Sequence, residues 1–144
     1  RIGRQQYKGC VDMKAFEEFC TQCSHKIIYN GDLNTVADIE RFRSQFTAIE
    51  SIMMGRGLLA RPSLAQEVIE GTEWHRAKRI ALLKKMHDHY HAHLSTIIPG
   101  EAQHLTKVRT FWEYMEEECG RKAWKKIMKA GSMRNYLNAI NELN

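Results

Sequence analysis

The 144-residue sequence has no uninterrupted apolar run of about 18 residues, which is the length that a membrane-spanning helix requires. It also lacks the basic segment followed by a short apolar segment that begins a secretory signal peptide. Neither membrane insertion nor secretion is therefore indicated. We expect a cytoplasmic protein that has no membrane partner.

The sequence lacks a second closely spaced cysteine pair, since only Cys20 and Cys23 among its four cysteines lie near each other. A structural zinc site would need a second, matching pair, which the sequence does not contain. The spacing of Met13, Phe16, Cys20 and Cys23 by three and four residues instead follows one face of a helix, with Asp12 as its N-cap. We therefore predict reduced thiols that pack as small apolar side chains.

Four of the seven histidines alternate along one short segment, as His87, His89, His91 and His93. Residues two apart on a helix point in nearly opposite directions, so the segment offers two separate pairs and not three converging ligands. We predict no metal site here. His87 falls on the apolar face of the predicted helix and is expected to be a hydrogen-bonded core residue.

Two short apolar runs, residues 27–29 and 52–54, each end in a polar turn that contains glycine. Each turn is followed by helical periodicity; in the first helix Thr35 is the predicted N-cap, and Ile39, Phe42 and Phe46 mark the buried face. The order strand, helix, strand, helix predicts a parallel βαβα unit. Ligands are expected at the carboxyl ends of its strands.

The two turns carry the residues of a candidate phosphate site. Asn30–Asp32 follows the first predicted strand, and Gly55 and Arg56 follow the second. Helix starts supply positive dipole ends, and the arginine adds an always charged guanidinium, so a phosphate would be favoured between them. Pro62 suits the first turn of the helix that follows. Taken alone, however, an Asn-Gly-Asp sequence is more often an ordinary turn, because both Asn and Gly tolerate positive φ.

These residues also carry a family resemblance. Tyr29–Asp32, Met54–Gly57 and Pro62 resemble the last two barrel strands of the flavin-dependent tRNA-dihydrouridine synthases. Upstream, Arg1, Gln5, Tyr7 and Gly9 match positions after that family's sixth strand. The resemblance is specific over residues 1–70 and looser beyond them.

The resemblance implies a cofactor and a substrate. It places Asn30, Gly31 and Asp32 at the phosphate and ribityl chain of FMN, and Gly55 and Arg56 at the phosphate. Tyr7 and Arg1 would lie near the target uracil. NADPH would reduce the flavin, and the catalytic cysteine would lie upstream, so no catalytic residue is assigned in this chain.

Length and periodicity define the expected fold. A complete (β/α)₈ barrel needs about 200 residues or more, so we expect residues 1–71 to be the carboxyl-terminal βαβα remnant of a TIM barrel. Residues 72–144 show helical periodicity throughout, which predicts an all-α helical bundle. One of its helices is predicted over the run from Leu105 to Cys119. The fold class is thus mainly α with a small parallel β part.

Charge is concentrated in the second half. Residues 1–70 hold nine basic and nine acidic side chains, whereas residues 71–144 hold thirteen and eight. Lys122, Lys125, Lys126 and Lys129 recur at the spacing of one helix face and could neutralise successive phosphates of a tRNA backbone. A merely solubilising lysine-rich surface remains an alternative.

The sequence therefore predicts the carboxyl-terminal part of a tRNA-dihydrouridine synthase, with tRNA as its partner and self-association of the incomplete barrel as a further expectation. Two alternatives stay open. One is an FMN- or phosphate-binding TIM-barrel oxidoreductase that acts on a small molecule. The other is a non-catalytic RNA-binding helical module.

Overall fold

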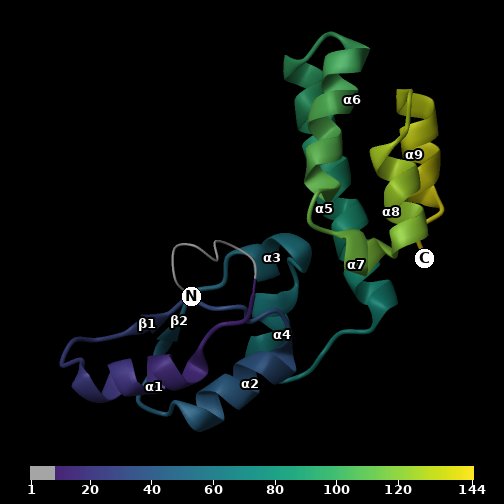
Figure 1. The fold of residues 1–144 in the computed structure, drawn as a ribbon. Coiled ribbons are helices and arrows are strands. Elements are labelled where there is room, and N and C mark those ends of the chain that lie inside the picture. Colours follow the sequence, from purple (N-terminus) through teal and green to yellow (C-terminus); the bar gives the residue numbers. More distant parts are fainter. Residues whose placement is uncertain (1–8) are drawn as a thin grey trace.

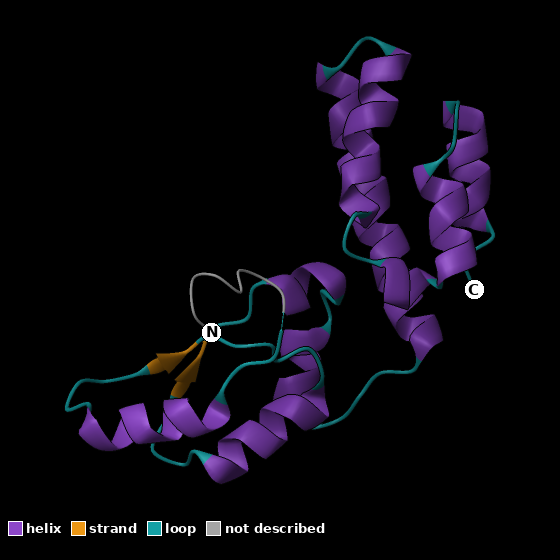
Figure 2. Ribbon diagram, viewed as in Figure 1, coloured by secondary structure: helices purple, strands orange, loops and turns teal. Residues whose placement is uncertain are grey.

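The computed structural model describes residues 9–144, which are mostly helical and include one small parallel sheet (Figures 1 and 2). The predicted site residues Arg1 and Tyr7 lie outside the described residues. In chain order the elements are α1 (Met13–Gln22), β1 (Ile28–Tyr29), α2 (Val36–Gln45), β2 (Ser51–Ile52), α3 (Arg56–Ala60), α4 (Leu64–Glu70), α5 (Arg76–Ile97), α6 (Glu101–Arg109), the 3₁₀ helix η2 (Thr110–Trp112), α7 (Glu116–Cys119), α8 (Arg121–Met128) and α9 (Met133–Asn141).

Residues 9–71 form the amino-terminal lobe, in which β1 and β2 pair in parallel. Ile28 lies opposite Ser51 and Tyr29 opposite Ile52, so the predicted parallel arrangement is confirmed, although each strand is only two residues long. The backbone N–H of Met53, just after β2, also donates to the carbonyl of Tyr29 at 2.7 Å, and the ladder between the two strands ends there. The sheet is thus limited to these two residue pairs.

Helix α2 begins where the sequence predicts, because the Thr35 hydroxyl accepts a hydrogen bond from the Asp38 backbone N–H at 3.1 Å. Its buried face carries Ile39 and Phe42, and Phe46 follows at the helix end. The Phe42 ring stacks on the Tyr29 ring of β1, with centroids 4.1 Å apart. This packing holds the first strand against α2.

The expected helix after the second strand is two helices, because α3 ends before Pro62 and α4 begins after it. Proline restricts the preceding residue and has no N–H to donate, so it ends one helix more readily than it continues it. The predicted place of Pro62 in a first turn is therefore wrong. Pro62 lies in the corner between α3 and α4.

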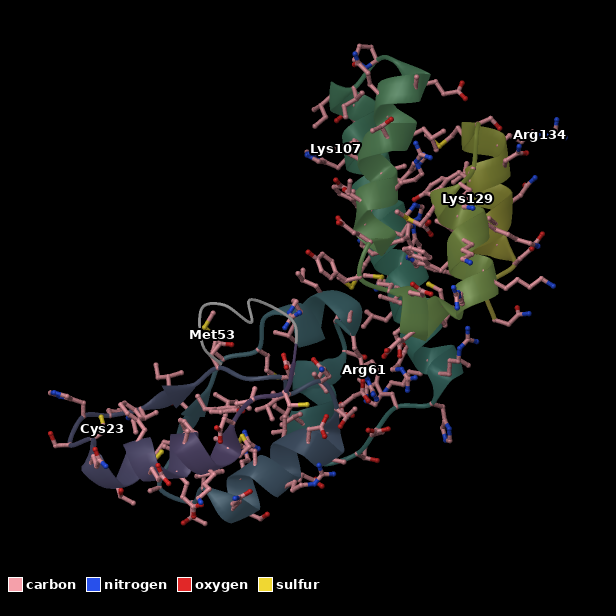
Figure 3. The ribbon with its side chains drawn as sticks, viewed as in Figure 1. Cys23, Met53, Arg61, Lys107, Lys129 and Arg134 are labelled. Carbon is pink, nitrogen blue, oxygen red and sulfur yellow. The ribbon has the colours of Figure 1, made fainter. Side chains whose placement is uncertain are left out.

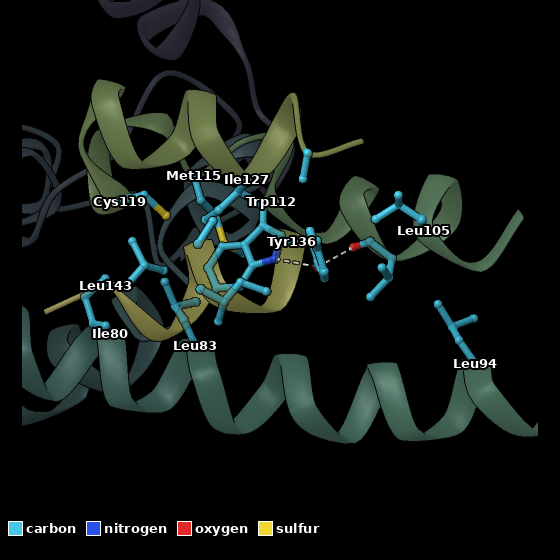
Figure 4. Close-up of a cluster of buried hydrophobic side chains, with 14 residues drawn as sticks. Ile80, Leu83, Leu94, Leu105, Trp112, Met115, Cys119, Ile127, Tyr136 and Leu143 are labelled. Carbon is cyan, nitrogen blue, oxygen red and sulfur yellow. Dashed lines mark hydrogen bonds between the residues drawn. The ribbon is translucent and has the colours of Figure 1, made fainter. Parts of the chain in front are cut away.

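Residues 72–144 form the carboxy-terminal lobe, in which α5–α9 surround one buried cluster (Figures 1 and 4). Trp112 and Tyr136 are fully buried at its centre, and the indole N–H of Trp112 donates to the Tyr136 hydroxyl at 2.9 Å. His87 of α5 bonds to the same hydroxyl through Nε2, at 2.8 Å. The predicted hydrogen-bonded core role of His87 is confirmed.

The prediction of one helix from Leu105 to Cys119 is wrong, because the chain there forms α6, η2 and α7. The break follows Trp112, whose carbonyl accepts from the Met115 N–H at 3.0 Å and from the Trp124 indole N–H at 2.7 Å. A tertiary partner thus occupies a carbonyl that a continuous helix would use. The residues of the predicted apolar face stay buried across the break, namely Leu105, Val108, Trp112, Met115 and Cys119.

The cysteines in the described residues are free thiols. Cys119 is buried in the carboxy-terminal cluster, as predicted for an apolar packing role, and burial raises its pKa to about 11. Cys20 and Cys23 are only half-buried, so the predicted packing of the first helix is looser than expected. Helix α1 nevertheless begins at its predicted cap, with the Ala15 N–H donating to Asp12 at 3.0 Å.

Candidate functional site

The ends of the two strands bring together residues that are far apart in the sequence. Asn30, Gly31 and Asp32 follow β1, while Gly55 and Arg56 begin the turn into α3. Nη2 of Arg56 donates to Oδ1 of Asp32 at 2.9 Å, across 24 residues of sequence. The structure therefore brings these two predicted residues into direct contact at the carboxyl ends of the parallel strands.

Two glycines allow this close approach. A Cβ on Gly57 would lie 2.7 Å from the carbonyl oxygen of Leu33, so only glycine lets α3 pack against the loop after β1. A Cβ on Gly31 would lie 2.0 Å from the Tyr29 hydroxyl. At Gly55, by contrast, a Cβ would meet nothing within 4 Å, so the space beside this residue is open. Gly31 and Gly57 are thus required by close packing, whereas Gly55 leaves open space at the strand ends.

A pocket of about 900 Å³ adjoins the strand ends and reaches the carboxy-terminal lobe. Asp32 and Arg56 line it, whereas Asn30, Gly31 and Gly55 do not. Its other lining residues are Gly9, Asn34, Thr35, Ala60, Arg61, Tyr114, Glu116, Glu117, Glu118, Gly120 and Arg121. The half-exposed Tyr114 also lines the pocket, although nothing in its sequence context pointed to a site.

The two sides of this pocket differ in their chemistry. Near the strand ends, the Arg56 guanidinium is accompanied by the Thr35 hydroxyl and the Asn34 side-chain amide, which are donors that suit an anionic oxygen. The α7 side has three glutamates against one lining arginine, Arg121, so its net charge is negative and disfavours an anion. The donor set fits a phosphate at the strand ends and not against α7.

The four predicted lysines of the second half also come together. Lys122, Lys125, Lys126 and Lys129 are exposed and line one open groove of about 650 Å³ along α8 (Lys129 is labelled in Figure 3). The other side of the groove carries Asn135 and Asn138 of α9 and Glu142, which directly follows that helix. The Lys126 ammonium pairs with the Glu142 carboxylate at 2.6 Å, so one lysine of the groove is already engaged.

Sequence reasoning missed the most buried carboxylate of the described chain. Glu67 is 0% exposed and bonds to Arg61, Ser63 and the Trp74 backbone. Burial alone would raise the pKa of Glu67, but the hydrogen bonds from these three donors outweigh it and lower the pKa to about 2. A signal did exist, because Glu67 lies three residues after Leu64 on the buried face of α4.

None of the described helices combines the length and apolarity that crossing a bilayer would need. A comparison with curated proteins found no match. A family model described as dihydrouridine synthase matches residues 1–143, which is nearly the whole chain. The chain therefore belongs to the dihydrouridine synthase family.

Proposed function

We propose that this chain is the carboxyl-terminal part of an FMN-dependent tRNA-dihydrouridine synthase, which reduces the C5–C6 double bond of a uridine in tRNA. The observation that carries the proposal is the family match over residues 1–143. In this proposal residues 1–71 complete a TIM barrel, and residues 72–144 are a tRNA-binding helical bundle. The two separate buried clusters, one before residue 71 and one after it, support this division.

The strand-end residues would hold the flavin. Arg56 would donate to the FMN phosphate, with Gly55 leaving room beside it, and Asn30, Gly31 and Asp32 would face the phosphate and ribityl chain. The contact between Arg56 and Asp32 supports this role, because it fixes the orientation of the guanidinium. Bound FMN, reduced by NADPH, would supply the hydride. This chain would anchor and orient the cofactor.

The lysine groove would hold the tRNA backbone. Four cations along one groove match a row of phosphates, and phosphate contacts fix register without reading sequence. Arg1 and Tyr7 would lie nearer the target base, which must leave its stack to reach the flavin. The groove favours a polyanionic substrate over the small-molecule alternative.

Measuring dihydrouridine in cellular tRNA by mass spectrometry tests this proposal directly. Disruption of the gene that encodes this chain should remove dihydrouridine from at least one tRNA position. Retention of dihydrouridine at every position would reject the proposal. If the protein binds tRNA but the tRNA of the undisrupted strain contains no dihydrouridine, the non-catalytic RNA-binding module would be favoured.

Complementation with Arg56→Ala tests the flavin site. Loss of one charge-assisted phosphate contact should weaken FMN binding by on the order of 1.5 to 3 kcal/mol, which is roughly 10- to 150-fold. The purified enzyme should then lose flavin absorbance on dialysis. Arg41→Ala is the matched control, because Arg41 is an exposed arginine of α2 that pairs only loosely with Asp38, at 3.6 Å. Equal flavin retention in both variants would reject Arg56 as a phosphate ligand.

A further inference from the structure

The two lobes have separate apolar cores. Among residues 9–144, the buried cluster of the amino-terminal lobe and that of the carboxy-terminal lobe share no residue. Apolar packing within each cluster therefore does not determine how the lobes are oriented to each other. That orientation needs contacts outside the two clusters, and these lie between α3 and α7 and where the chain passes from α4 to α5.

A buried carboxylate occupies this junction. Oε1 of Glu67 accepts from Arg61 Nε at 3.0 Å and from Ser63 Oγ at 2.6 Å. Oε2 accepts from the Trp74 backbone N–H at 2.8 Å and from Nη2 of Arg61. Both carboxylate oxygens are thus used twice, and the Arg61 fork is bound in a bidentate manner. Arg61 lies where the two lobes approach each other (Figure 3).

The same contacts continue into the carboxy-terminal lobe. Trp74, which lies between α4 and α5, accepts through its carbonyl from Nη1 of Arg79. Arg79 of α5 also binds Glu118 of α7, with Nε 2.8 and 3.1 Å from the two carboxylate oxygens. A continuous chain of hydrogen bonds therefore runs from α4 through the connecting segment to α5 and α7.

We propose that Glu67 is a positioning residue, at the centre of an interlobe joint formed by Arg61, Ser63, Glu67, Trp74 and Arg79. Hydrogen bonds are directional, and a fully satisfied buried polar network specifies a single geometry where apolar contacts would allow several. Arg61 directly follows α3, the helix that begins with Arg56. The joint consequently sets the position of the strand-end site relative to α5–α9.

Two variants separate positioning from stability. Glu67→Gln removes the charge that pairs with Arg61. It also places an amide N–H₂, which is a donor, against groups that are themselves donors. The double variant Arg61→Met/Glu67→Met replaces the buried ion pair with apolar side chains of similar size, so no buried charge is left unpaired, although the Ser63 hydroxyl and the Trp74 N–H lose their acceptor. Glu50→Gln is the matched control, since it removes an exposed carboxylate of the same lobe that pairs with Lys26.

Pulsed electron paramagnetic resonance measures the interlobe distance. Spin labels would be attached at Glu40→Cys in α2 and Lys107→Cys in α6, with Cys10, Cys20 and Cys23 replaced by serine. We expect one narrow distance distribution for the parent and for Glu50→Gln, and a distribution at least twice as wide for both joint variants. The double variant should lose less of the parent's melting temperature than Glu67→Gln does, because it leaves no buried charge unpaired. An unchanged interlobe distance distribution in the double variant would overturn the proposal that this joint sets the orientation of the lobes.

A consequence for catalysis rests on the proposed function. In the complete enzyme, the double variant should retain flavin and tRNA binding but form dihydrouridine at least tenfold more slowly, because the two sites are no longer held in register. A full rate with a widened distribution would show that the joint does not position the reaction. The distance measurement itself needs no enzymatic activity, so its outcome stands apart from that of the proposed function.

Discussion

His87 shows how a titratable side chain can be held inside the carboxy-terminal lobe. It is 0% exposed, and its ring contacts the Tyr136 hydroxyl through Nε2 at 2.8 Å and Asp88 through Nδ1 at 3.2 Å. Burial lowers the pKa of His87, and the neighbouring His91 lowers it further, against an opposing effect of Asp88. His91 in turn stacks on the His104 ring of α6, with centroids 4.7 Å apart.

This lowered pKa predicts a pH-dependent stability. Because the unfolded chain binds a proton on this histidine at higher pH than the folded chain does, the free energy of unfolding should fall as the pH drops below about 6.5. One such group contributes a slope of up to about 1.4 kcal/mol per pH unit. Urea unfolding of His87→Gln between pH 5 and 8 should show lower stability and a shallower slope than the parent.

The matched control for this measurement is His93→Gln, because His93 is an exposed histidine of the same helix. It should retain the pH slope of the parent. His91, whose pKa burial and His104 also lower, contributes a slope of its own. A His87 variant with the full parental slope would therefore contradict the assignment of this titration to His87.

Residue-level features were predictable from the sequence where their partners are local. The predicted caps Asp12 and Thr35 are confirmed, since each accepts from a backbone N–H three residues later in the chain. Tyr136 was not foreseen, because its hydroxyl joins partners 24 to 49 residues away. The burial of His104 was not foreseen either; its Nε2 has no hydrogen-bond partner among the described residues. Only the tertiary fold brings such groups together.

At the scale of elements, periodicity predicted the presence of helices and strands better than it predicted their lengths. The parallel pairing of two strands was foreseen from apolar runs and turns, but their length of two residues depends on where the helices let the chains diverge. Likewise, the burial of Leu105 and Cys119 followed their spacing, whereas the break between them depends on the Trp124 indole. Local pattern fixes which face is buried, and tertiary hydrogen bonds fix where a helix ends.

Helix α8 provides a prediction at this scale. If its groove holds RNA backbone, Lys125→Gln/Lys129→Gln should remove two phosphate contacts, each worth about 0.7 to 0.9 in the slope of log affinity against log salt concentration. The slope in a filter-binding titration with tRNA should therefore fall by roughly 1.4 to 1.8. These two lysines are preferred to Lys126, which already pairs with Glu142.

Two further variants control for net charge. Lys14→Gln/Lys85→Gln makes the same change in charge at exposed positions outside the groove and should leave the slope unchanged. Glu142→Gln should raise the affinity, because it releases Lys126 and removes a carboxylate from the groove. If the groove variant and the Lys14/Lys85 variant behave alike, the lysines of α8 form only a solvated face.

At the scale of the whole molecule, the two lobes differ in how much apolar surface they bury. The described amino-terminal lobe has seven residues in its buried cluster, and the carboxy-terminal lobe has fourteen. The exposed Ile28 side chain, at 63%, lies on a sheet whose strands pair only with each other among residues 9–144. The domain boundary at residue 71 remains a prediction, although it coincides with the passage between these two clusters.

This asymmetry predicts the order in which the molecule opens. Amide hydrogen exchange under monomeric conditions should be faster in residues 26–60 than in residues 76–118, because two-residue strands and a small core give little protection against local unfolding. Raising the protein concentration should slow exchange at residues 26–60 selectively, since a second copy can pair with an open sheet edge. Light scattering over the same concentrations would detect the dimer. Slower exchange in residues 26–60 than in 76–118 at low concentration would contradict this account, because the small sheet would then be the most stable part of the chain.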